Sequence, residues 1–559
     1  MCINPSKETK PSRADSIAAS APVAIGEMTR SSAGPSRTMT RMDVSKRSDP
    51  DSLCLLIIGE NVYNCTRWQK NHPGGHLTIR ALSGKDATDP FGATHPRWVQ
   101  ERMLSKFLYA KLEPDREEAL DDQKDSTRVS EDKISTLPSS LGAKDDEATL
   151  AFRLLTKEME EAGMFETDYT FYYKKMVAYS ILLSLVLAGV FLSDRILVHT
   201  LAGALLGIFW QQMAFIGHDL GHNAVTHNRI YDSYLGLFVG NFCTGISIGW
   251  WKRSHNVHHI ATNSCTYDPD IQHLPIFAVD PVLVTTKLFS TYAKMYMPLS
   301  DIAHVFVKYQ HWLYYPVMAF ARFNLYVQSL NHALRLSYYS TAADLIWRQN
   351  LQIASLAGFW TWLIALTMSL PTWESRILFF LPAHMVAGIL HVQITLSHFP
   401  MDTYTGVTYD DSANGYLRTQ LATTLDVDCS KAMDWFHGGL QFQVEHHLWP
   451  RLPRHNLRRA KEILESFCKT HNLVYNKASF FKANCMVVDT LKETALSTKD
   501  FSELFHESAN LIGWTINGWP SYWIKDGIRF VFDHINDDIL NNAILSAASL
   551  TCKSTCYCK

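Results

Sequence analysis

The segment MVAYSILLSLVLAGVFLS, residues 176–193, decides the fold, because it carries no charged side chain over almost the full length of a membrane-spanning helix. A helix needs about 20 consecutive apolar residues to cross the hydrocarbon core of a bilayer. Three other segments come close to this length with similarly apolar sequence, at residues 197–215, 352–370 and 377–396. The sequence therefore predicts a mostly helical membrane domain with four transmembrane helices.

The four segments form two pairs with very short connections. Asp194 and Arg195 separate the first pair, and residues 371–376 separate the second. Each pair is therefore predicted to be a helical hairpin, which returns the chain to the side of the membrane where it started. This topology places the N-terminal region, residues 216–351 and everything after residue 397 on one face.

Basic residues gather on this shared face, which the positive-inside rule assigns to the cytosol. They are Lys174, Lys175, Lys252, Arg253, Arg451, Arg454, Arg458 and Arg459. Residues 234–251 are apolar but rich in glycine and polar side chains, so we expect an interfacial or re-entrant segment there. An additional span is the alternative.

Composition separates this membrane domain from polar flanks. The 559 residues are 47% hydrophobic with a formal net charge of -2, which argues against a nucleic-acid partner. Residues 1–50 are predicted to be a disordered tail and residues 113–147 a flexible linker, so residues 51–112 form a small soluble domain. Residues 148–500 then make up the membrane domain, and residues 501–559 are a C-terminal extension to which we assign no role.

The cysteines favour neither a disulfide framework nor a structural zinc site. Most are scattered singly, and the terminal cluster of Cys552, Cys556 and Cys558 has no histidine nearby. Reduced thiols facing the cytosol are expected. The opening MCINPSKETKPSR lacks the apolar core of a secretory signal, so membrane targeting is expected to come from internal segments.

Three polar motifs follow hydrophobic segments on the predicted cytosolic side. They read HDLGH, HNVHH and QVEHH, and their spacing of i, i+3 or i, i+4 places each set on one face of a helix. The candidate metal ligands in them are His218, His222, His255, His258, His259, Gln443, His446 and His447.

Neutral imidazole is the commonest metal ligand in proteins, and a set this rich suits iron, copper, nickel or zinc. Seven histidines and a glutamine exceed one tetrahedral site, so two metals sharing the cluster is the economical interpretation. The alternative is that the histidines serve only packing or solvation.

Two single histidines are additional candidates for ligands or for residues that orient a ligand. They are His398, at the end of the fourth span, and His437, before the third motif. The remaining single histidines His199, His304, His311, His332 and His384 are expected to be ordinary satisfied polar residues.

The soluble domain contains HPGGH at residues 72–76 and GKDATDPFGATHP at residues 84–96. His72 and His95 are candidates for both axial ligands of a haem, and two strong axial ligands leave no open position for oxygen, which favours electron transfer. Glycines after His72 permit a tight turn beside the ring. The alternative is a small domain with incidental histidines.

Residues 51–112 resemble the cytochrome b5 family, in which HPGG carries the first haem histidine and GKDAT with His95 matches the second half. His76 departs from the acidic residue common there. Together with the three polar motifs, the chain from about residue 51 to 500 resembles the membrane front-end desaturases, and Gln443 in place of histidine is the most specific mark. The sequences around the second and third motifs, WWKRSHNVHHIATN and GGLQFQVEHHLWPRLPRHNLRRA, are most similar to those of fungal delta-8 sphingolipid desaturases.

This resemblance implies a fold and a set of cofactors. The fold is a helical membrane domain of about four transmembrane helices in two hairpins with a cytosolic helical cap, preceded by an α+β haem domain. The cofactors are haem b between His72 and His95 and two non-haem iron ions, with O2 as co-substrate. The implied iron ligands are His218, His222, His255, His258, His259, His398, His446 and His447, with Gln443 in or beside the set.

The resemblance also implies an activity and partners. The activity is introduction of a double bond at carbon 8 of a sphingolipid long-chain base, with a ceramide or long-chain base as membrane lipid substrate. Removing hydrogen from an unactivated methylene pair needs an oxidant that side chains cannot provide, so metal-activated oxygen must carry the chemistry. Electrons would come from an NADH-cytochrome b5 reductase, and the protein would be a multi-pass protein of the endoplasmic reticulum membrane with both metal sites facing the cytosol.

Three other functions stay open at this point. A delta-6 or delta-5 fatty acyl desaturase would use the same cofactors on an acyl chain. A membrane hydroxylase would use the same iron set, although Gln443 disfavours it. A non-catalytic haem electron carrier would leave the other histidines without metal.

Overall fold

A computed structural model describes residues 37–113, 147–298, 300–335, 348–407 and 415–498 of the chain. The predicted linker, apart from residues 113 and 147, lies outside these residues. So do the first 36 residues and the predicted C-terminal extension from residue 501.

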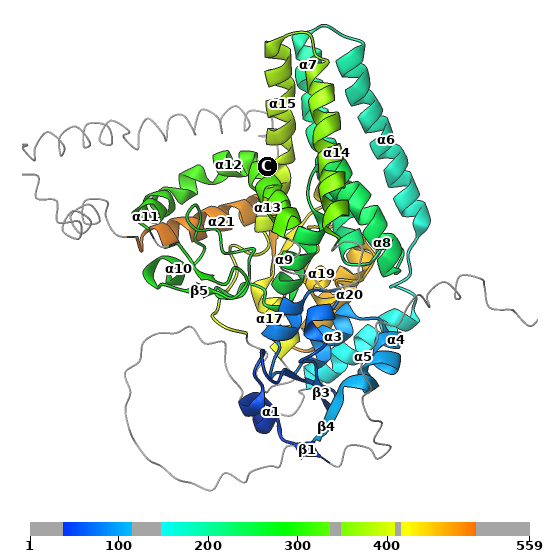
Figure 1. Cartoon of the computed structure of the whole chain (residues 1–559), viewed down its shortest axis with the longest axis vertical. Coiled ribbons are helices and arrows are strands. Elements are labelled where there is room, and N and C mark those ends of the chain that lie inside the picture. The colour runs from blue at the N-terminus through cyan, green and yellow to red at the C-terminus, as the bar shows by residue number, and fades with distance from the viewer. Residues whose placement is uncertain (1–36, 114–146, 299, 336–347, 408–414, 499–559) are drawn as a thin grey trace, which may run out of the picture. The chain divides into compact units, whose positions relative to one another are not determined.

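Four helices in the described part of the chain are long and apolar enough to cross a membrane. They are α6 (Tyr169–Phe191), α7 (Ile196–Gly221), α14 (Gln349–Met368) and α15 (Trp373–Ala387), the last continued by α16 (Ile389–Thr395). Figure 1 shows α6, α7, α14 and α15 running side by side away from the other elements. The four predicted spans and their pairing into two hairpins are therefore confirmed.

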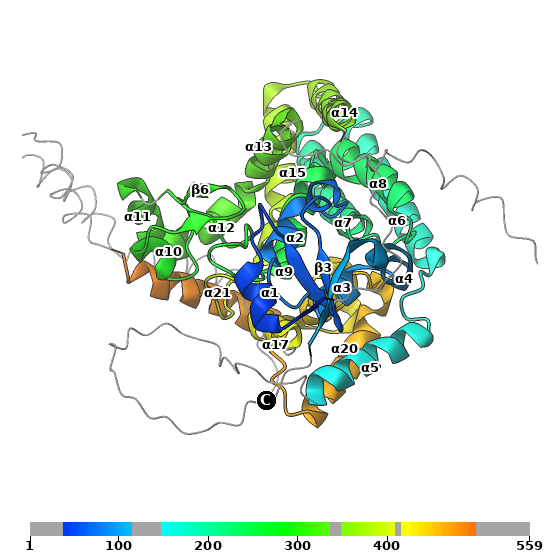
Figure 2. The same cartoon turned by 60° about the horizontal axis from the view of Figure 1, so that its bottom comes forward.

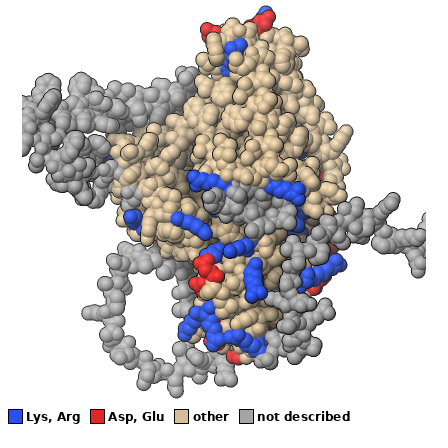
Figure 3. Space-filling view, viewed as in Figure 1, with Lys and Arg blue, Asp and Glu red and all other residues tan. Residues whose placement is uncertain are grey.

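The surface of this bundle fits a lipid environment. Figure 3 shows a broad band without charged residues on the bundle, with Lys, Arg, Asp and Glu confined to its tip and to the opposite part of the molecule. On α6, Val177, Ile181 and Leu185 are largely exposed. Because apolar side chains face outward along the helix, the bundle is expected to sit in hydrocarbon.

Close packing of α7 against α15 depends on two glycines. A methyl group added at Gly203 would lie 2.1 Å from the carbonyl oxygen of Phe379, and one added at Gly207 would lie 2.5 Å from that of Ala383. Small residues allow membrane helices to approach closely and gain van der Waals contact. These positions therefore fix the distance between the two hairpins.

The N-terminal module has a sheet with the strand order β1-β4-β3-β2. Its elements are β1 (Thr38–Met39), α1 (Arg41–Arg47), β2 (Leu55–Ile58), β3 (Asn61–Asn64), η1 (Gln69–Asn71), α2 (His76–Ala81), α3 (Thr88–Thr94), α4 (Arg97–Met103), η2 (Leu104–Phe107) and β4 (Leu108–Leu112). β1 pairs in parallel with β4, and Val44 of α1 is fully buried.

These contacts correct the predicted start of the module. Residues 38–47 are part of the fold, whereas the sequence suggested a disordered tail up to residue 50. The tail composition is polar and basic, and the strand has only two residues. Its order comes from pairing with a strand some 70 positions later, which local composition cannot reveal.

Between the hairpins the chain forms shorter elements that cover one end of the bundle. They are α8 (Arg229–Gly236), the π-helical η3 (Leu237–Thr244), α9 (Ile248–Ile260), α10 (Val282–Thr285), β5 (Phe289–Ser290), β6 (Met295–Tyr296), α11 (Asp301–Lys308), α12 (Gln310–Phe320) and α13 (Arg322–Arg335). The stretch 234–251 is thus broken by Gly245, whose φ of 74° is left-handed, and does not form a fifth long helix.

After the second hairpin the chain completes this cap. The elements are α17 (Gly415–Thr423), β7 (Asp426–Asp428), η6 (Lys431–Met433), α18 (Asp434–His437), α19 (Gln443–Leu448), η7 (Arg454–Asn456), α20 (Leu457–Thr470), β8 (Lys477–Ser479) and α21 (Phe480–Ala495). α5 (Glu147–Glu161) precedes the first span. One hydrophobic cluster joins Leu56 of the N-terminal module, Phe152 of α5 and Trp449 of the cap, so these parts share a core.

Candidate metal centre and haem pocket

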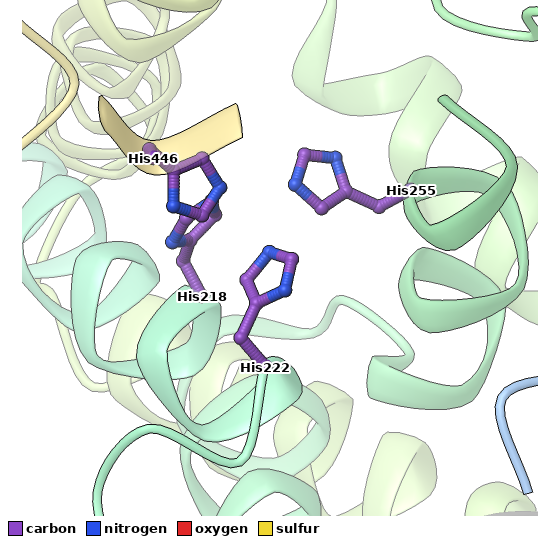
Figure 4. Close-up of side chains that lie close together, drawn as sticks. All are labelled: His218, His222, His255 and His446. Carbon is purple, nitrogen blue, oxygen red and sulfur yellow. The ribbon is translucent and has the colours of Figure 1, made fainter. Parts of the chain in front are cut away.

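Three helices bring the predicted ligands together at the end of the bundle. α7 carries His218 and is capped at its C-terminus by His222, and α9 and α19 carry the second and third motifs. Figure 4 shows His218, His222, His255 and His446 pointing into a common space. The helical spacing that placed each set on one face thus aims all three sets at one point.

The histidines form two groups. One ring nitrogen from each of His218, His222, His255 and His446 lies within 4.8 Å of the others, and the same holds for His258, His398 and His447. Asp270 lies within the same distance of one nitrogen each of His255 and His258 and so links the two groups. His259 lies between the groups: its Nε2 is 3.1 Å from that of His255, and its ring stacks on His447 with centroids 4.3 Å apart. Two neighbouring imidazole-rich groups suit two metal ions of a kind that prefers nitrogen ligands.

Hydrogen bonds fix the orientation of the rings in the second group. His258 donates from Nδ1 to the buried carboxylate of Asp268 at 2.8 Å, and His447 Nδ1 lies 2.9 Å from Oε1 of Gln420. His398 Nδ1 lies 3.3 Å from the backbone oxygen of Thr423. With Nδ1 engaged in this way, Nε2 of each ring is left for a metal.

Several ring nitrogens in the cluster are buried without a hydrogen-bond partner. Among the described residues of the cluster this holds for Nε2 of His222, His446 and His447 and for Nδ1 of His259. An unpaired buried nitrogen costs free energy, and coordination of a metal ion would remove that cost. The donor set therefore fits bound metal.

Burial also sets the protonation of the rings. It lowers the pKa well below 6.5 at His255, His259, His446 and His447. These rings are neutral at pH 7, which is the form that binds metal. At His258 burial acts in the same direction, but Asp268 and Asp270 outweigh it and raise the pKa to about 8.

Gln443 and His437 occupy different surroundings. Gln443 is buried and lines a pocket together with His218, His222 and His446. His437 lies outside both groups, where its ring packs against Phe436 and Phe480. The single histidine His199 has hydrogen-bond partners on both ring nitrogens, Ser375 and the backbone oxygen of Ser193, as expected for a structural residue.

Asp268 and Gln420 are site residues that sequence reasoning missed. Asp268 lies in the sequence DPD, ten residues after His258. An acidic residue shortly after a histidine motif can orient a metal-binding ring, so the sequence did contain a signal for this role. Gln420 lies on α17 and also donates from Nε2 to the backbone oxygen of His259 at 2.9 Å. Its sequence neighbourhood carries no comparable signal.

The N-terminal module places His72 opposite His95. Their Nε2 atoms are 3.5 Å apart, while each Nδ1 lies about 3 Å from a backbone oxygen, that of Gly75 for His72 and that of Phe91 for His95. The facing Nε2 atoms are the groups that would hold a haem between the two rings, and such a bis-histidine haem would supply electron transfer.

The turn beside this pair needs its glycines. Gly75 has a φ of 93°, and a methyl group added at Gly74 would lie 2.9 Å from Cε1 of His72. Burial lowers the pKa of His72, and it lowers that of His95 to about 3, so both rings are neutral and able to bind iron at pH 7.

Comparison with known proteins adds two family matches. Residues 195–479 match the family described as fatty acid desaturase, and residues 40–113 match the cytochrome b5-like haem/steroid binding domain. The second match starts near β1, in agreement with the corrected boundary.

Curated relatives match over most of their length. A Delta(8)-fatty-acid desaturase of Helianthus annuus is 38% identical over 85% of this chain and 95% of its own. A Delta 8-(E)-sphingolipid desaturase of Komagataella phaffii is 34% identical over 81% of this chain and 92% of its own. An Acyl-lipid (9-3)-desaturase of Borago officinalis is 35% identical over 83% of this chain and 95% of its own.

Proposed function

Because the chain belongs to the fatty acid desaturase family and carries a cytochrome b5-like domain in the same polypeptide, we propose that it is a delta-8 sphingolipid desaturase. It introduces a double bond at carbon 8 of a long-chain base, free or within a ceramide. The observation that carries the proposal is the gathering of two histidine groups at one end of four membrane helices, next to a domain with a facing histidine pair. Relatives from plants and yeast whose names specify delta-8 support the position of the bond.

The residue roles follow from the two groups. One iron would be held by His218, His222, His255 and His446. The other would be held by His258, His398 and His447. His259 lies between the two groups and could bind either iron. Gln443 lines the same pocket, at the edge of the first group. His72 and His95 would hold haem b. The bound irons supply the oxidising power that removes two hydrogen atoms with O2 as co-substrate, and the haem supplies electrons.

The protein side chains hold the candidate ligand rings in place. Asp268, Gln420 and the backbone at Thr423 hold the rings of the second group. The lipid chain enters from the bilayer between the spans, while its polar head stays near the surface of the cap. The distance from that head to the irons then selects the carbon that reacts.

The proposal includes the membrane and the electron donor. An NADH-cytochrome b5 reductase reduces the haem domain from the cytosol, and the chain resides in the endoplasmic reticulum membrane with both metal sites on the cytosolic side. The basic residues of this face support the orientation.

A fatty acyl desaturase is the second candidate function. Its specific support is the Borago officinalis relative, whose name describes an acyl-lipid substrate and whose identity is similar to that of the sphingolipid-named relative. Both functions use the same iron and haem sites, so only the product separates them.

Expression in a yeast that lacks polyunsaturated lipids tests the function directly. We expect mass spectrometry to locate a new double bond at carbon 8 of long-chain bases, and His258→Ala to abolish it. His471→Ala is the control, since His471 is a partly exposed histidine that follows α20. New double bonds in fatty acids alone would show that the protein is a fatty acyl desaturase. A hydroxylated product without unsaturation, or a protein with haem iron but no other iron, would refute the desaturase.

A further inference from the structure

The haem domain touches the helix that carries the second histidine motif. Asn256, which lies between the candidate ligands His255 and His258 on α9, donates from Nδ2 to the backbone oxygen of Gly74 at 2.9 Å. Gly74 belongs to the turn that follows His72. One hydrogen bond thus joins the turn beside a candidate haem ligand to the helix of the proposed metal centre, and α2 lies beside α9 in Figure 2.

A second contact is made by α5 through two ion pairs of opposite polarity. Arg153 binds Asp89 with two bonds, Nε to Oδ1 at 2.6 Å and Nη2 to Oδ2 at 3.1 Å. Glu160 of the same helix pairs with Arg97 at 2.6 Å. Arg153 and Glu160 are seven residues apart and therefore lie on one face of α5. This face presents a positive charge to Asp89 and a negative charge to Arg97. A reversed domain would bring like charges together, and the pattern therefore selects one orientation.

Both ion pairs lie on the elements that flank His95. Asp89 is in α3, whose C-terminal cap is His95, and Arg97 is the first residue of α4. The two haem ligands are thus each tied to the membrane part of the chain, His95 through α5 and His72 through α9.

α5 is itself held by the cap. Phe152 stacks on Trp449 with centroids 5.4 Å apart, and Trp449 Nε1 donates to Thr156 Oγ1 at 2.9 Å. Trp449 directly follows α19, which carries the third motif. The helix α5, which pairs with the haem domain, therefore also packs beside the helix that carries the third histidine motif.

We propose that α5 and α9 form a fixed docking site for the haem domain of the same chain, and that Asn256 is a positioning residue for electron transfer from haem to the iron pair. This inference rests on the proposed function. One electron at a time leaves the haem, which is oxidised, and enters the iron pair, which is reduced, with no bond formed or broken. An NADH-dependent flavoprotein then reduces the haem again.

Hydrogen exchange with charge-swap variants tests the docking without any turnover. In the purified holoprotein, Arg153→Asp places two carboxylates together, and we expect amide exchange in α3 and α5 to rise about tenfold. Asp89→Arg combined with Arg153→Asp restores an ion pair and should bring exchange back near the original rate. Lys157→Asp is the matched control, because it makes the same charge change on α5 at an exposed residue whose partner Glu161 is on the same helix. Exchange that is equally fast in the unaltered protein and in Arg153→Asp would overturn the docking.

Stopped-flow absorption then tests the electron path. The dithionite-reduced protein is mixed with oxygenated buffer that contains ceramide, and haem reoxidation is followed. We expect Arg153→Asp and Asn256→Ala each to slow reoxidation about tenfold while the haem spectrum and iron content stay unchanged, and the charge swap to recover the rate. His258→Ala gives the background rate without the complete iron site.

The outcomes separate this inference from the proposed function. Faster exchange in Arg153→Asp with unchanged reoxidation would refute the role of docking in electron transfer. Failure of the double swap to recover either rate would refute the specific pairing. Absence of a desaturated product in a protein whose exchange shows a docked haem domain would refute the proposed function and leave the docking intact.

Discussion

At the scale of single residues, we expect the proposed metal centre to depend on the side chains that hydrogen-bond to the histidine rings as well as on the rings. Asp268 is fully buried and accepts hydrogen bonds from His258 Nδ1 and from the backbone N–H of Asn263, both at 2.8 Å. Asp270 lies farther away, 3.8 Å from His258 Nδ1, and its side chain is 41% exposed. The two acidic residues of one DPD motif thus have different contacts with the same ligand.

This difference predicts different iron affinities for two isosteric variants. Asp268→Asn removes the charge that orients His258, so we expect iron affinity to fall about 10- to 100-fold. Asp270→Asn should lower it less, because Asp270 lies 3.7 Å from His255 Nδ1 and 3.8 Å from His258 Nδ1, beyond hydrogen-bond distance of both rings. Iron content measured against chelator concentration checks both, and equal losses would show that the hydrogen bond of Asp268 has no special role.

The haem pair gives a second test with a close control. His72→Ala should abolish the haem absorption band, because one axial ligand is lost, and should leave the other iron bound. His76→Ala, four residues later in α2, removes a histidine whose ring takes no part in the facing pair and should keep haem. A variant His72→Ala that still binds haem with a bis-histidine spectrum would contradict the assignment.

At the scale of elements, the contact between α7 and α15 is set by helix glycines. Gly203→Ala would put a methyl group 2.1 Å from a backbone oxygen of α15, so the helices must separate, at a cost of about 1–3 kcal/mol. Gly217→Ala on the same helix meets its nearest neighbour at 3.7 Å, an ordinary contact. We expect thermal unfolding in detergent to occur at lower temperature for the first variant and at an equal or higher one for the control.

The junction of β7 with α19 contains a buried acid. Asp426 accepts a hydrogen bond from the backbone N–H of Val444 and lies beside Tyr475 and Glu445. Burial raises the pKa of Asp426 from 3.8 to about 6. Because the folded pKa is raised, the unfolded chain loses this proton first. Stability therefore falls as pH rises between about 4 and 6 and stays lower above that range.

Asp426→Asn should weaken this dependence, because the amide stays neutral at every pH. The variant should gain stability relative to the original protein as pH rises from 4 to 7. Unfolding temperatures of both proteins across this range measure the gain. A difference that does not change with pH would show that the carboxyl is not held protonated in the folded state.

At the scale of the whole molecule, the two hairpins put every candidate site on one side of the membrane. His222 directly follows α7 and His398 follows α16, so both lie at the same end of the bundle. The opposite end consists of the turns after α6 and after α14. A centre at one membrane face can receive electrons from a cytosolic donor and lipid from the bilayer at the same time.

Glycosylation mapping tests this topology in cells. A hydrophilic loop with an Asn-Gly-Ser acceptor inserted between Asp194 and Arg195 should be glycosylated, because the proposed orientation places that turn in the lumen. The same loop inserted after His471, on the cap, should stay unmodified. Modification of the second site would place the metal centre in the lumen and contradict the proposed orientation.

The sequence by itself determined the features that depend on local pattern. Apolar segments of membrane length predicted the four spans, and short connections predicted their pairing. A single segment in hydrocarbon can satisfy all its backbone hydrogen bonds by itself only as a helix, so its neighbours need not be known. The i, i+3 and i, i+4 spacing predicted which histidines share a face, and HPGG with His95 predicted the facing pair.

Only the tertiary structure decided the features that depend on contacts between distant residues. It divided the histidines into two groups, left His437 outside them, brought Gln420 and Asp268 behind the rings, and placed residues 38–47 in the haem domain. The physical reason is that hydrogen-bond partners and strand pairs are chosen by proximity in the fold. Gln420 approaches His447, and β1 approaches β4, only after the chain has packed around a common core.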